Sequence, residues 1–281
     1  MKSPTGFYPF WAGIGGKEHL PIFKHLFNPA EFWTPFPVPT ISMDYPNRQE
    51  LRRIGWAYWN WSSWPMTTSR VVDAAARAAK DLDPSLTPGA AELLMRYTKV
   101  HFIKGDLKHP CVSEYFDPVT GAPNAPNLDY AHSYYIDLIL RHVVGIEADP
   151  LSDEVRINPL NMGLEYFEAR NIRVKAHDLS VSWKHGKFTV SVDGKSVATA
   201  TELKPLKVRL SRTATNQHVE HSVMSFDGYS EKPTPTRPAN LGVQDRKDGR
   251  FVARAAVVGT NPAATGDKCC FGLDSVLLAN P

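Results

Sequence analysis

Residues 137–160, DLILRHVVGIEADPLSDEVRINPL, contain the change of pattern that decides the fold. A helical pattern that begins at residue 128, in LDYAHSYYIDLILRHVVG, ends at Gly145. After Asp149 the segment EVRINPL alternates apolar and polar residues, which is typical of a strand. The sequence therefore predicts an α+β protein with a helical part followed by a β part.

The part before this boundary contains three further helical patterns. Residues 17–33 place apolar residues at helical spacing until Asn28, which with the next proline ends the helix. Pro65 opens a strong helix over residues 65–82, because proline suits a first helical position and the alanines that follow favour helix. Another helix follows over residues 87–104, and loops rich in aromatic residues and proline join these helices.

The part after the boundary consists of short alternating segments. Residues 171–200 form several strands, with His185-Gly186 and Asp193-Gly194 as hairpin turns. Further strands are expected at 203–210, 250–258 and 273–278, and the polar stretch 212–250 contains a linker, EKPTPTRP. These patterns divide the chain into a helical domain at 1–148, a small β-sandwich-like module at 149–211, and a linker and tail of uncertain fold at 212–281.

Composition is that of a globular protein. The 281 residues are 42% apolar and 22% charged, and the net charge is only +3. Because basic residues are not clustered and no apolar run approaches about 20 residues, neither a nucleic-acid partner nor a membrane span is expected. The three cysteines define no disulfide framework. The start, MKSPTGFYPFW, lacks the apolar core of a signal peptide, so localisation is not predicted.

Three motifs in order carry a family resemblance: GFYPFWAGI at 6–14, WNWSSWPMTTS at 59–69 and SEYFDPVTG at 113–121. They resemble the six-hairpin (α/α)6-barrel glycosidases, most closely the mannosylglycerate-hydrolase-like and family 63 glycoside hydrolases, and trehalases more distantly. The β segment after residue 170 resembles the small module that follows this barrel in some members. Trp61 and Ser62 depart from the Gly-Pro of the second motif, and Phe116 stands where the third often has tyrosine.

The length of the chain is the larger departure, because the helical part is too short for six helical hairpins. The resemblance therefore implies the second half of a toroid, whose N-terminal half belongs to a longer parent chain. It also implies that the general acid, an aspartate, lies in that missing half. The missing signal sequence would then have the same cause, and the parent could be secreted.

The resemblance assigns Glu114 as the general base of an inverting glycoside hydrolase acting on α-linked oligosaccharides. Such enzymes use one carboxylic acid to protonate the leaving oxygen and one carboxylate to activate water, roughly 6.5–9.5 Å apart. The next residues, Asp117-Pro118, predict a turn that the Asp117 side chain caps. Alternatively, Glu114 is a surface carboxylate at a helix end. Asp44 and Asp106 are the candidates within this chain that could replace the missing general acid, although neither lies in a recognised acid motif.

Candidate sugar-binding residues are Trp59, Asn60, Trp64, Trp11 and Tyr8. A pyranose packs its C–H face on an aromatic ring while an indole N–H can still donate, and an asparagine amide pairs with hydroxyl groups. The alternative for each tryptophan is core packing between helices.

No metal or cofactor is expected. The spacing of His101, Asp106 and His109 fits no standard site, and the sequence has neither a nucleophile elbow nor a phosphate loop. The expected partners are an oligosaccharide and the missing half of the barrel. The competing hypothesis is a non-catalytic carbohydrate-binding or structural half-domain.

Overall fold

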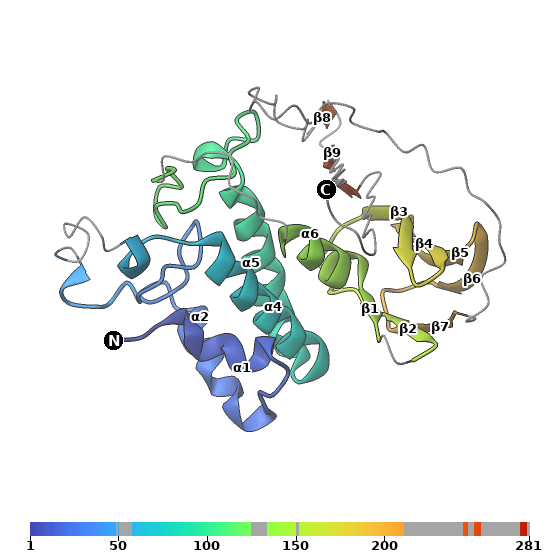
Figure 1. Cartoon of the computed structure of the whole chain (residues 1–281), viewed down its shortest axis with the longest axis horizontal. Coiled ribbons are helices and arrows are strands. Elements are labelled where there is room, and N and C mark those ends of the chain that lie inside the picture. Colours follow the sequence, from blue (N-terminus) through green and yellow to red (C-terminus); the bar gives the residue numbers. More distant parts are fainter. Residues whose placement is uncertain are drawn as a thin grey trace, which may run out of the picture. The chain divides into compact units, whose positions relative to one another are not determined.

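The computed structural model contains helices and antiparallel sheets, so the chain is α+β as predicted. It divides into a helical unit, Met1–Val143 with Leu160–Met162, and a strand unit, Val144–Pro159 with Gly163–Pro281 (Figure 1). The structure describes residues 1–48, 50, 58–124, 134–149 and 152–210, and the backbone of 244–246, 250–253 and 276–279. The predicted linker at EKPTPTRP lies outside the described residues.

Helix α4, Pro65–Asp81, is the central element of the helical unit. Its proline occupies the first turn, as predicted, and 12 of its 17 residues are buried. Helices α1, Tyr8–Trp11, α5, Thr87–Val100, and α6, Tyr134–Leu138, pack against it (Figure 1). The Tyr97 hydroxyl of α5 donates to the carbonyl of Pro65 at 3.1 Å, which fixes one end of α4.

The other helical predictions hold with changed bounds. The first segment is a 3₁₀ turn at Lys17–Ile22, which contains Pro21, followed by α2, Phe23–Leu26, and it ends before Asn28 as predicted. Helix α5 ends at Val100 rather than 104. The last helix is described from Tyr134 onward and finishes as a π-helix over Ile139–Val144, just before Gly145. Shorter 3₁₀ turns occur at Pro4–Phe7, Tyr58–Asn60, Pro84–Leu86 and Ile103–Gly105. Among the described helices, none combines the length and apolar character that crossing a membrane requires.

An aromatic cluster closes the helical unit beside α1 and α2. Phe23 packs against Phe7 and Phe10 with ring centroids 5.7 and 4.9 Å apart, and Phe7 meets Phe32 edge to face at 5.9 Å. All four rings are buried. Part of the dense aromatic content of the first 70 residues is therefore core.

The strand unit contains two antiparallel sheets. A three-stranded sheet has the order β1-β2-β7, and a seven-stranded sheet has the order β6-β5-β4-β3-β10-β9-β8. Strands are described within the predicted segment 250–258 (β9) and overlapping the predicted segment 273–278 (β10), and both join the larger sheet. The strands are β1 Ile146–Ala148, β2 Glu154–Ile157, β3 Tyr166–Val174, β4 His177–Lys184, β5 Lys187–Val192, β6 Lys195–Ala200, β7 Leu206–Arg209, β8 Gln244–Arg246, β9 Arg250–Ala253 and β10 Val276–Ala279.

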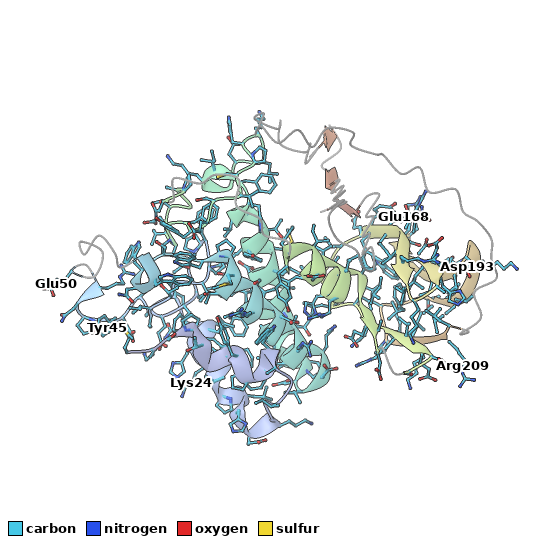
Figure 2. All side chains as sticks on the ribbon, in the orientation of Figure 1. Lys24, Tyr45, Glu50, Glu168, Asp193 and Arg209 are labelled. Atoms are coloured by element: carbon cyan, nitrogen blue, oxygen red, sulfur yellow. The ribbon has the colours of Figure 1, made fainter. Side chains whose placement is uncertain are left out.

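Both predicted hairpin turns are confirmed. His185 and Gly186 have φ of 51° and 69°, and Asp193 and Gly194 have φ of 49° and 77°, as a two-residue turn with positive φ at both positions requires. Asp193, labelled in Figure 2, also accepts hydrogen bonds from the backbone N–H of Asp178 at 3.0 Å and pairs with His177 Nδ1 at 2.7 Å. These bonds hold the turn against the start of β4.

Candidate active site

A backbone bridge joins the second and third sequence motifs. The N–H of Ser63 donates to the carbonyl of Phe116, and the N–H of Phe116 donates to the carbonyl of Ser63, both at 2.9 Å. The Ser63 hydroxyl also donates to the carbonyl of Phe36 at 2.6 Å. The loop that precedes α4 and the loop that carries Glu114 are therefore one rigid pair, although 53 residues separate them in sequence.

Three aromatic rings stack beside this bridge. Trp59 and Trp64 lie parallel with centroids 3.6 Å apart, and Tyr115 covers Trp64 at 4.8 Å. Trp64 and Tyr115 are 7% and 5% exposed, whereas Trp59 is 49% exposed. Both faces of Trp64 are thus covered, and its ring supports Trp59 rather than meeting a ligand directly. Asn60 follows Trp59 in the 3₁₀ turn and is half-buried.

Glu114 is half-buried and lies between two buried residues, Ser113 and Tyr115. The Ser113 hydroxyl donates to the carbonyl of Tyr115 at 3.1 Å, which tightens the backbone around the glutamate. Among the described residues, we find no hydrogen-bond or ion-pair partner for the Glu114 carboxylate. A half-open carboxylate that pairs with none of the described residues can accept hydrogen bonds from a ligand or from water.

The turn after Glu114 is capped as predicted. One carboxylate oxygen of Asp117 accepts the backbone N–H groups of Val119 at 2.9 Å and Thr120 at 2.8 Å. Gly121 closes the turn with φ of 67° and donates its N–H to the carbonyl of Asp117. The turn therefore restrains the loop on the C-terminal side of Glu114.

Tyr8 and Trp11 form a second aromatic group, on α1. Their rings meet edge to face at 5.8 Å, and the Arg70 guanidinium of α4 lies 5.5 Å from the Tyr8 ring centroid and 5.1 Å from that of Trp11. The Trp11 indole N–H donates to the Tyr134 hydroxyl at 3.0 Å. This N–H is therefore not free for a sugar hydroxyl, and Trp11 can offer a ligand only its ring.

A buried carboxylate, Asp73 of α4, anchors this second group. Its Oδ1 accepts from Arg77 Nε at 3.1 Å and from His142 Nε2 at 2.7 Å. Its Oδ2 accepts from the Tyr134 hydroxyl at 2.7 Å and from Arg141 at 2.8 Å. Four donors saturate the roughly four lone-pair sites of a carboxylate.

Protonation states in this network follow from burial and charge. Burial alone would favour the neutral acid, but hydrogen bonds from His142 and Tyr134 and the charge of Arg141 hold the pKa of Asp73 well below its usual range. Burial lowers the pKa of His142 to about 4, so its imidazole is neutral and Nε2 carries the proton donated to Asp73. Burial and the bond to Asp73 raise the pKa of Tyr134.

Sequence reasoning missed Arg70, Asp73, Tyr115 and Tyr134. One signal for Asp73 was available: it is the only acidic residue in the run RVVDAAARAAK, on a helix whose apolar residues cover most of its surface. A charge that is buried in such a helix needs partners from elsewhere in the fold. Nothing comparable marks Tyr134 or Tyr115.

The two substitute acids are poorly suited to donating a proton. Asp44 pairs with Lys2 at 2.6 Å, and this hydrogen bond lowers the pKa of Asp44. Asp106 pairs with His109 at 2.8 Å, and a backbone hydrogen bond from Lys108 together with His109 lowers the pKa of Asp106. A general acid needs a pKa that is raised rather than lowered.

The histidines near residue 105 do not form a metal site. His101 is half-buried and packs against Tyr97 and Tyr135 with ring centroids 5.0 and 4.2 Å apart, whereas Asp106 and His109 are exposed. Within the described parts of the chain, no group of three or more metal-binding side chains comes together.

Comparison with known proteins finds a similarity to a family of glycoside hydrolase domains. Residues 1–133 match the family model described as "Mannosylglycerate hydrolase MGH1-like glycoside hydrolase domain", which confirms the resemblance of the three motifs. No curated protein matches the chain. A solved structure called "Sialidase" is similar in fold, with a TM-score of 0.63 and 21% identity over 73% of this chain. The chain spans only 20% of the length of that protein.

Proposed function

We propose that this chain is the base-bearing part of an inverting (α/α)6 glycoside hydrolase that acts on α-linked oligosaccharides. The observation that carries the proposal is the bridge between Ser63 and Phe116, which sets the loop of Glu114 beside the stack of Trp59, Trp64 and Tyr115. A restrained, half-open carboxylate next to an exposed aromatic ring suits a base beside a sugar platform.

In this mechanism Glu114 accepts a proton from water as the water attacks the anomeric carbon. The leaving oxygen must receive a proton from an acid on the opposite face of the sugar, roughly 6.5–9.5 Å from the base. Asp44 and Asp106 are held ionised by their partners, so neither suits this role. We therefore assign the acid, and the helices that complete the toroid, to another part of a longer protein.

The proposed substrate contacts divide between two groups. The open face of Trp59 stacks on a pyranose while the Asn60 amide pairs with its hydroxyl groups, and Trp64 holds Trp59 in place. Tyr8 and Trp11 bind a further part of the oligosaccharide, with Trp11 contributing its ring alone because Tyr134 takes its N–H.

A second candidate is a carbohydrate-binding half-domain without turnover. The exposed Trp59 ring and the lack of a suitable acid at Asp44 or Asp106 favour it. Both candidates predict sugar binding, but only the first predicts that Glu114 matters for catalysis in a longer parent protein.

The test is a Glu114→Gln substitution in the full-length parent. The amide keeps the shape of the side chain and loses the base, so turnover should fall by about 10²–10⁴-fold while sugar binding is kept. Glu18→Gln, an exposed glutamate of the same unit, is the matched control and should not change turnover. Activity is measured as product release from α-glucosides and α-mannosides, and the first-formed anomer is identified by NMR.

Three results would contradict the proposal. Unchanged turnover in Glu114→Gln would remove the base assignment, and retention of anomeric configuration would overturn the inverting mechanism. Robust turnover by the 281-residue chain alone would show that its acid lies within this sequence. The expected result for that chain alone is no appreciable hydrolysis.

A further inference from the structure

The Tyr134 hydroxyl of α6 joins three elements of the helical unit. It accepts a hydrogen bond from the Trp11 indole N–H of α1 at 3.0 Å and one from Arg141 at 3.2 Å. It donates its own proton to Oδ2 of Asp73, on α4, at 2.7 Å. A hydroxyl has one donor and two acceptor positions, so these three bonds use all of them.

The chemistry of the partners sets the direction of each bond. An indole N–H and a guanidinium can only donate, whereas an ionised carboxylate can only accept. Burial favours the neutral acid, but hydrogen bonds from His142 and Tyr134 and the charge of Arg141 hold the pKa of Asp73 well below its usual range. The hydroxyl proton therefore points to Asp73, and the Tyr134 oxygen is presented to Trp11 as an acceptor.

Asp73 is a fixed anchor for this relay. It is fully buried on the central helix, and its other oxygen accepts from Arg77 at 3.1 Å and from His142 at 2.7 Å. The indole edge of Trp11 is thus tied, through one hydroxyl, to a carboxylate that cannot turn.

The Trp11 ring needs such a tie more than most aromatic rings of this unit. Helix α1, Tyr8–Trp11, has four residues, which is too short to be stable by itself, and the Trp11 side chain is half-exposed. The tie to Tyr134 holds one edge of the ring inward, so its exposed part keeps one orientation before a ligand arrives. A ring that is already ordered loses less conformational freedom on binding.

We propose that Tyr134 is a positioning residue, which is held by Asp73 and orients the Trp11 ring for stacking on a sugar. This inference rests on the proposed carbohydrate-binding function and adds to it the group that orients one of its aromatic platforms. Tyr134 itself touches no sugar in this arrangement.

The first measurement needs no ligand. In an NMR spectrum of the 281-residue chain, loss of one signal in Trp11→Phe assigns the indole N–H of Trp11 among those of the seven tryptophans. Tyr134→Phe removes the acceptor, so this signal should shift and its hydrogen should exchange faster with solvent. Tyr135→Phe is the matched control, because the neighbouring hydroxyl donates to Thr98 Oγ1 at 3.0 Å and its loss also removes one internal hydrogen bond.

The second measurement is binding of maltotriose and of α-mannobiose, titrated by NMR. Tyr134→Phe should weaken binding about fivefold, which corresponds to the cost of ordering one mobile side chain. Tyr135→Phe should keep the affinity of the unsubstituted chain. Circular dichroism checks that each variant is folded.

A double-mutant cycle separates positioning from general stabilisation. In the Trp11→Phe background, Tyr134→Phe should not weaken binding further, because phenylalanine has no N–H to orient. A merely structural role of Tyr134 would instead lower the affinity equally in both backgrounds.

Each alternative outcome overturns a definite statement. An unchanged Trp11 signal or an unchanged affinity in Tyr134→Phe would overturn the positioning role and leave the carbohydrate function standing. Equal weakening in Tyr135→Phe, or in both backgrounds of the cycle, would reduce Tyr134 to a stabilising residue. If Tyr134→Phe does not fold, fast exchange of the Trp11 indole hydrogen in the unsubstituted chain would overturn the tie itself. Binding of neither sugar by that chain would contradict its carbohydrate function and with it the role of Tyr134.

Discussion

Replacing Asp73 by asparagine should strongly destabilise the helical unit. The asparagine amide keeps the volume of the side chain but replaces one acceptor oxygen by an NH₂ donor. Each oxygen of Asp73 accepts two hydrogen bonds, so this NH₂ group would face two donors instead of accepting from them. Arg77 and Arg141 also lose the negative charge that balances them. Removing one partner of a buried ion pair typically costs about 3–5 kcal/mol, and we expect a loss in that range.

Urea unfolding followed by tryptophan fluorescence measures this loss. All tryptophans except Trp183 lie between residues 11 and 64, so the signal reports mainly on the helical unit. Asp83→Asn is the control, because Asp83 is a half-exposed cap that accepts from the Ser85 N–H at 2.9 Å and asparagine caps equally well. A loss below about 1 kcal/mol in Asp73→Asn would refute the view that this network is an ionised, fully paired centre.

Two further predictions concern pH and backbone strain. Burial lowers the pKa values of His101 and His142 to about 4. Between about pH 6.5 and pH 4 these two histidines are therefore protonated in the unfolded chain but neutral in the folded chain. The free energy of unfolding should fall as the pH drops through this range, by about 3 kcal/mol per histidine. Urea titrations across this range should show the fall, His101→Gln should reduce its slope, and a flat profile would contradict it. Gly145→Ala should destabilise the chain far more than Gly163→Ala, because both have positive φ but only at Gly145 would a Cβ meet backbone atoms, the nearest at 2.2 Å. Thermal unfolding compares the two variants, and equal losses would count against the close approach at Gly145.

The helices and hairpins were predictable because local chemistry determines them. Pro65 and the alanines that follow specify α4, and the two X-Gly pairs at 185–186 and 193–194 specify their turns. The π-helix over Ile139–Val144 was not predictable, since its apolar spacing resembles that of an α-helix and only packing decides between them.

The site was less predictable because it depends on contacts between distant residues. No sequence pattern distinguishes Trp59 from Trp64, and Tyr115, far along the chain, covers the face of Trp64 that Trp59 does not. Asp73 and His142 are likewise 69 residues apart. Single-sequence patterns report on neighbours within a helix or strand, not on such pairs.

The paired backbone bonds between Ser63 and Phe116 couple the motion of two loops. Opening either loop breaks both bonds, so hydrogen exchange should give the same free energy of opening for the two amides. A ligand that orders the loop of Trp59 should then slow exchange at Phe116 as well as at Ser63, although the side chain of Phe116 is fully buried. Hydrogen exchange at the Phe116 amide, on the loop that carries Glu114, therefore reports whether a ligand occupies the aromatic stack.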